Sequence, residues 1–185
     1  MVSLASLWLP ILVAAAGVFI ASSIIHMATP WHHNDFGAVP DQTRMLEALR
    51  TFNLQPGDYV VPRPASQKEG ASPEFAELAK RGPMVMMAVL PGQVVIAKNL
   101  VLWFVYCAVV ATCAAYIAGA ALPAGAAAKK VFQFAGATAF FGFALALWQQ
   151  TIWYSRSVVT TLKSTIDGLV YALVTAGVFA WLWPQ

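Results

Sequence analysis

One short stretch of the sequence holds side chains of the kinds that bind metal ions. All three histidines of the chain and an aspartate fall within ten residues, and they are His26, His32, His33 and Asp35. Imidazole nitrogens and carboxylate oxygens are ligands for zinc, copper, nickel and iron. The spacing matches no established metal motif, and His26 and His32 can converge only if the chain turns back after Pro30. We favour the alternative, that these polar side chains lie at the level of lipid headgroups.

A second candidate is the pair of opposite charges formed by Lys163 and Asp167, four residues apart. Asp167 could be an intramembrane acid that handles protons or cations, because charged groups within membranes are usually functional. The run Ser164-Thr165-Ile166-Asp167 also has the S-x-x-[DE] form of a capping box, which predicts that Asp167 stabilises the positive N-terminal end of a helix. We favour the cap, so the pair is predicted to mark the start of a helix.

Signals of enzymatic chemistry are missing from the rest of the sequence. It holds no nucleophile elbow, phosphate-binding loop, dinucleotide fingerprint or H-E-x-x-H motif. We therefore predict no catalytic residues, no cofactor-binding residues and no enzyme. No cofactor is expected, with a transition metal at the histidines as the one alternative.

The composition is that of a membrane protein. Of 185 residues, 59% are hydrophobic and 10% charged, against roughly 45–50% and 25% in soluble domains. A bilayer core needs about 20 apolar residues of helix. Four segments meet this length, and they are residues 4–28, 100–122, 131–154 and 166–183. Tryptophans such as Trp31 are expected to anchor the helix ends at the interface. The net charge of +3 includes no basic block, which excludes nucleic acid as a partner.

Small residues recur at every fourth position in two of these segments. The ridges are Ala111, Ala115 and Gly119, and Gly168, Ala172, Ala176 and Ala180. Such ridges let helix backbones approach closely. They predict tight packing, either within the chain or against another membrane subunit or a second copy.

Residues 29–93 form an aqueous insertion that holds seven of the eight acidic residues. The pattern predicts an amphipathic helix at 42–52, a short strand at 59–61, a polar hinge at 67–71 and a helix that starts after Ser72 and ends at Gly82. The apolar run 84–90 is either a second strand or a segment that dips into the interface. The predicted fold is thus an all-α membrane protein of four transmembrane helices, with a small α/β extramembrane cap between the first two.

Lysine and arginine predict the orientation of the helices. Four crossings place both termini on one side with the turn that carries Lys129 and Lys130, and the other nine basic residues on the opposite side. By the positive-inside rule the cap is cytoplasmic and both termini are periplasmic.

Three motifs along the chain allow a comparison with known families. They are His26-Met27 with Trp31-His32, Pro56-Gly57-Asp58-Tyr59, and Lys163-Ser164-Thr165-Ile166-Asp167-Gly168-Leu169. In these motifs, and over most of its length, the chain resembles a group of small bacterial inner-membrane proteins with four helices and a large first loop. The resemblance implies a bacterial inner membrane. It implies no activity, cofactor or site residue.

Three functional hypotheses follow. The first, which we favour, is a non-enzymatic accessory or assembly partner of a larger membrane complex, supported by the small-residue ridges, the compact cap and the lack of catalytic motifs. The second is a copper- or zinc-type metal-binding protein that uses His26, His32, His33 and Asp35. The third is a small oligomeric transporter or channel, for which Asp167 is the main candidate residue.

Overall fold

The computed structural model describes all residues from Met1 to Gln185. The chain forms two compact units. Met1–Gly37 together with Ile96–Gln185 make a helical unit, and Ala38–Val95 make a smaller second unit. Residues 29–37, predicted as part of the cap, therefore lie with the helices.

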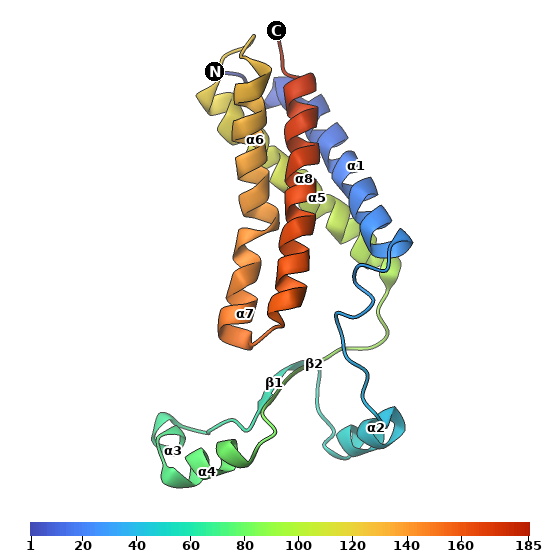
Figure 1. Ribbon diagram of the computed structural model, residues 1–185, viewed down its shortest axis with the longest axis vertical. Helices are drawn as coiled ribbons and strands as arrows, with labels where there is room; N and C mark the ends of the chain where they lie inside the picture. The colour runs from blue at the N-terminus through green and yellow to red at the C-terminus, as the bar shows by residue number, and fades with distance from the viewer. The chain divides into compact units, whose positions relative to one another are not determined.

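Four long helices make up the helical unit (Figure 1). They span Leu4–Ala28, Ile96–Ala121, Ala128–Tyr154 and Val158–Trp181, and each is long and apolar enough to cross a membrane. The first contains α1 (Trp8–Ser23) and ends in a π-helical turn, Ile24–Ala28. The second is α5, the third contains α6 (Ala128–Phe143) and α7 (Trp148–Tyr154), and the fourth is α8. Both termini lie at the same end of this unit.

The fourth helix begins eight residues earlier than the sequence predicted, at Val158 rather than 166. Ser155 takes a left-handed conformation that ends α7, and the Ser157 hydroxyl accepts a hydrogen bond from the Thr160 amide. Ser157 is therefore the N-cap of α8. The predicted capping box is wrong: Asp167 lies more than two turns inside the helix and is buried, so Lys163 and Asp167 do not mark the helix start.

The third helix is interrupted at a point where it packs closely against Gly168 of the fourth. Ala144 leaves helical geometry, with φ −123° and ψ −50°, and a short 3-10 turn at Leu145–Leu147 follows. A Cβ atom on Gly168 would lie 2.8 Å from the Ala144 Cβ. The absence of a side chain at Gly168 thus permits the contact between α8 and this break.

The small-residue ridges pack inside the chain. Ala111, Ala115 and Gly119 of α5 are buried, as are Gly168, Ala172 and Ala176 of α8. The Gly119 carbonyl accepts a hydrogen bond from the Val2 amide (2.8 Å). These six residues therefore pack within the chain, whereas Ala180, the last residue of the second ridge, is only partly buried.

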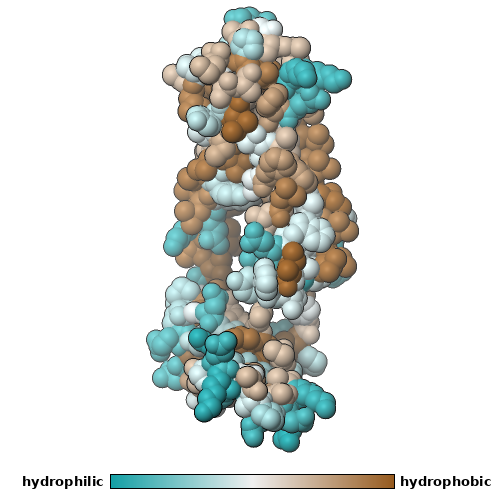
Figure 2. Space-filling view, turned by 90° about the vertical axis from the view of Figure 1, so that its left-hand side faces the viewer, coloured by the Kyte–Doolittle hydropathy of each residue, from teal (hydrophilic) through white to brown (hydrophobic).

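The outer face of the helical unit is apolar, as a lipid-facing surface would be. Large hydrophobic side chains such as Leu12, Val101 and Trp181 are exposed. Figure 2 shows hydrophobic residues over much of the helices, whereas hydrophilic residues gather on the second unit. Length, composition and surface agree with a multi-pass membrane protein.

The second unit contains two strands and three short helices. Strands β1 (Gly57–Val61) and β2 (Val85–Val89) pair antiparallel, with Tyr59 opposite Met87. The helices are α2 (Gln42–Thr51), α3 (Gln67–Gly70) and α4 (Pro73–Arg81). Asp41 caps α2 and Ser72 caps α4, which starts directly after Ser72 as the sequence predicted. The predicted hinge at 67–71 is instead a single helical turn, because Ser66 caps it.

Candidate metal site

The chain turns back on itself directly after the first long helix. The Thr29 hydroxyl donates to the Ile25 carbonyl (2.6 Å), which closes the π-helical turn. Two consecutive turns follow, since the amide of His33 donates to the Pro30 carbonyl and that of Asp35 to the His32 carbonyl, each at 3.1 Å. This reversal carries His32 back over the end of the helix on which His26 lies.

His32 bridges two carboxylates through its two ring nitrogens. Its Nδ1 lies 2.6 Å from the Asp35 Oδ2 and its Nε2 lies 2.8 Å from the Asp167 Oδ2. The side chains of the two aspartates are 9% and 6% exposed. A histidine therefore joins the segment after the first helix to the interior of α8.

Lys163 and Trp31 complete the network. The Lys163 Nζ pairs with the Asp35 Oδ1 at 3.0 Å, and it donates to the Trp31 carbonyl at 2.7 Å. The Trp31 Nε1 donates to the Asp167 Oδ1 at 3.1 Å. Lys163 and Asp167 thus bind the same loop from successive turns of α8, each with its own partner.

The electrostatic balance of this network favours an ionised Asp35. Burial by itself would raise the pKa of Asp35, but the hydrogen bonds and charges of His32 and Lys163 outweigh it and lower the pKa below its ordinary 3.8. Opposite charges and hydrogen bonds to the charged form both stabilise a carboxylate.

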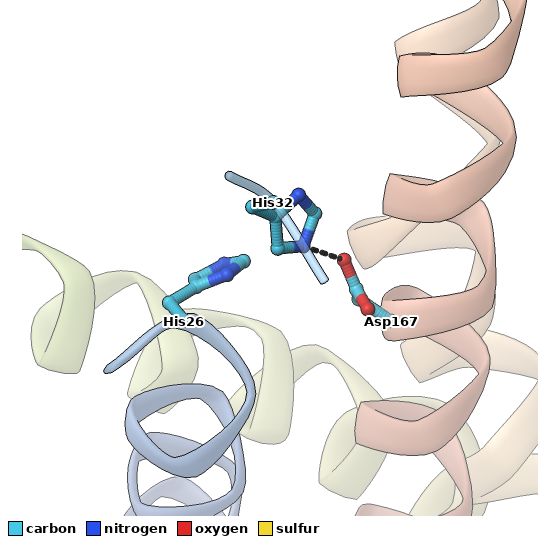
Figure 3. Close-up of side chains that lie close together, drawn as sticks. All are labelled: His26, His32 and Asp167. Carbon is cyan, nitrogen blue, oxygen red and sulfur yellow. Dashed lines mark hydrogen bonds and ion pairs between the residues drawn. The ribbon is translucent and has the colours of Figure 1, made fainter. Parts of the chain in front are cut away.

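His26 brings a second imidazole to the same place. The rings of His26 and His32 lie edge to face with centroids 4.3 Å apart. One ligand atom from each of His26, His32 and Asp167 lies within 4.8 Å of the other two. Figure 3 shows the three side chains together, with the hydrogen bond between His32 and Asp167 as a dashed line. His33, also predicted as a ligand, is exposed and outside this group, and Asp35 occupies the far side of His32.

Two histidines and one carboxylate are a donor set for a divalent transition metal. Tetrahedral zinc with bonds of about 2.0–2.1 Å separates its ligand atoms by about 3.3 Å. The His32 Nε2 and the Asp167 Oδ2 lie 2.8 Å apart, so an ion between them would have to replace their direct hydrogen bond and separate them slightly. His26 is exposed, and its ring would have to move closer to these two atoms. Two outer contacts resemble those of metal proteins: the Asp35 Oδ2 lies 2.6 Å from the His32 Nδ1, where it could accept a proton from that nitrogen, and Trp31 donates to the second oxygen of Asp167. Such outer hydrogen bonds orient ligands.

An aromatic cluster lies one turn further along α8. Tyr171 packs edge-on against Trp103 and Phe143. Trp103 in turn donates to the Ser22 hydroxyl of α1 at 2.8 Å. The Tyr171 hydroxyl is buried without a hydrogen-bond partner. This cluster connects α1, α5 and α8 next to the network and fixes the helix that carries Asp167.

The sequence indicated some of these residues and missed how they combine. It singled out His26, His32, Asp35, Lys163 and Asp167, but as two separate groups. Trp31 was interpreted as an interfacial anchor, whereas it binds Asp167. The one signal that could have joined the groups was the occurrence of Lys163 and Asp167 beside an apolar segment, since charged groups there need polar partners.

No protein-family model, no curated protein sequence and no solved structure matches this chain.

Proposed function

We propose that this protein is a multi-pass membrane protein that binds a divalent transition-metal ion through His26, His32 and Asp167. One observation carries the proposal: ligand atoms from two distant parts of the chain lie within 4.8 Å of one another. The hydrogen bonds of Asp35 and Trp31 to the outer atoms of two of these ligands support it. Because the group contains no thiolate or thioether, the proposal favours zinc or a similar borderline ion over Cu(I).

The setting we propose follows from charge and resemblance. The resemblance implies a bacterial inner membrane, and the positive-inside rule puts both termini in the periplasm and the second unit in the cytoplasm. His26 lies at the end of the first helix furthest from the N-terminus, so the metal site would face the cytoplasm.

The accessory-partner hypothesis has less support than metal binding. One of its arguments was the ridges of small residues, and most of these residues pack within the chain. Asp167 is buried inside α8, which agrees with the hypothesis that it is an intramembrane acid. In the proposed site this carboxylate would bind the metal ion.

Metal titration of the detergent-purified, chelator-treated protein tests the proposal. Co²⁺ serves as the probe because tetrahedral Co²⁺ absorbs visible light, and elemental analysis gives the stoichiometry. We expect one ion per chain in the wild type and in His33→Ala, and loss of binding in His26→Ala. His33→Ala is the matched control, since both side chains are exposed histidines seven positions apart.

Two outcomes would overturn the proposal. The first is a wild-type protein that binds neither Co²⁺ nor Zn²⁺, which would make the network a purely structural clasp. The second is equal loss of binding in His26→Ala and His33→Ala, which would indicate non-specific binding to surface histidines. Because His26 is exposed, its substitution is expected to leave the helices folded.

A further inference from the structure

The second unit has no hydrophobic core of its own. None of the residues Ala38–Val95 is buried, and its one sheet has two strands. An isolated two-stranded sheet is at best marginally stable in water, and small domains depend on apolar burial. Some other apolar surface must therefore cover part of this unit.

Its exposed apolar residues gather in one segment of the chain. Met84, Met86, Leu90, Val94 and Val95 are each more than half exposed. No charged residue occurs between Arg81 and Lys98. The rest of the unit, from Ala38 to Arg81, holds six basic and six acidic residues. The unit is thus divided along the chain into a charged part and an uncharged, apolar part.

Covalent connection keeps this segment near the bilayer. Val95 is joined directly to Ile96, the first residue of α5, which is a candidate membrane span. An extended chain covers at most about 3.6 Å per residue, so Leu90 lies within roughly 22 Å of the start of α5. The first helical turn of a spanning segment lies at the level of the headgroups, and hydrocarbon begins just beyond it.

We propose that the apolar segment formed by Met84, Met86, Leu90, Val94 and Val95 lies in the boundary between lipid headgroups and acyl chains. The bilayer supplies the apolar phase that the unit lacks. Burial at the interface stabilises such segments in proportion to the apolar area removed from water. The strand β2 then has a lipid-facing side, and the charged helices α2 and α4 contact water.

Spin-label accessibility in lipid nanodiscs tests this inference on the full-length chain. Single cysteines replace Met86, Leu90 and Val94 in a Cys113→Ala background; Cys107 is buried and stays unlabelled. Oxygen concentrates in lipid, whereas a nickel chelate stays in water. We expect labels at the three positions to be relaxed more by oxygen than by nickel. Glu77→Cys on α4, whose side chain is 63% exposed, is the aqueous control and should show the reverse.

Both other outcomes would overturn the inference. Nickel accessibility at the three positions equal to that at Glu77→Cys would mean that the segment contacts water. Low accessibility to both reagents would mean that protein covers it, either from this chain or from a second copy. The experiment does not involve the metal ligands, so its result is independent of the metal proposal.

Discussion

At the residue scale, His32 is held by both of its ring nitrogens, and this makes Asp35 a positioning residue. Asp35 binds Nδ1, so Nε2 is the nitrogen directed at Asp167. In metal sites such a carboxylate fixes the ring orientation and raises the basicity of the ligand. Lys163 in turn fixes Asp35 through its ion pair. The orientation of the His32 ring and the ion pair to Lys163 of α8 thus both depend on the Asp35 carboxylate, which need not touch the ion.

Asp35→Asn is expected to weaken Co²⁺ binding by about 10–100-fold without abolishing it. The amide oxygen can still accept the Nδ1 proton, but it carries no charge to polarise the ring or to pair with Lys163. The measurement is the same visible-absorption titration. Asp41→Asn is the matched control, because it makes the same change at the α2 N-cap, where Asn serves as well as Asp. Equal affinity in both variants would show that Asp35 has no role in metal binding.

The lowered pKa of Asp35 also predicts how the metal-free protein responds to acid. A carboxyl group with a depressed folded-state pKa stabilises the fold above its unfolded pKa, here 3.8, and loses this contribution as pH falls through the lower folded value. The difference in unfolding free energy between wild type and Asp35→Asn should be fully present at about pH 5 and shrink progressively as the pH falls below it. Denaturation of both proteins in detergent across this range measures it. A difference that stays constant down to the lowest pH would mean that His32 and Lys163 do not stabilise the carboxylate.

At the scale of elements, the sequence predicted the four apolar helices but not all of their ends. The fourth helix was placed late because Val158 to Lys163 mix polar and apolar residues, and a capping motif at Ser164 gave a plausible start. In the structure the helix starts after the left-handed turn at Ser155, with Ser157 as its N-cap, and a single serine is a weak signal for a helix start. The break at Ala144 has no local signal either, because it depends on contact with Gly168 of another helix.

Two glycines of α8 should therefore respond oppositely to substitution by alanine. At Gly168 a Cβ would meet the Ala144 Cβ at 2.8 Å and backbone atoms at 3.3 Å, so Gly168→Ala is expected to cost about 1–3 kcal/mol of stability. Gly177 has nothing within 4 Å of the added atom, and Gly177→Ala should stabilise by up to about 1 kcal/mol through helix propensity. Thermal unfolding in detergent compares the two. If both variants gain stability, the contact between α8 and the break at Ala144 is looser than observed.

At the scale of the whole molecule, composition predicted the membrane class and the four crossings, because hydrophobic length is a property of the sequence alone. The site was only partly predictable. His26 and His32 are both far from Asp167 in sequence: His32 reaches Asp167 because the chain reverses after Pro30, and His26 lies near it because α1 and α8 belong to the same helical unit. A spacing rule that works for ligands on one helix cannot anticipate ligands brought together by packing.

Orientation is the remaining whole-molecule property that the charges predict. With Lys129 and Lys130 on one side and nine basic residues on the other, both termini should be periplasmic. A C-terminal fusion to alkaline phosphatase, which is active only outside the cytoplasm, is expected to be active in a bacterial host. The same enzyme fused after Gln93, behind a single crossing, is the control and should be inactive. The reverse pair of activities would put the termini in the cytoplasm, and the His26, His32 and Asp167 group, at the opposite end of the helices, would then face the periplasm.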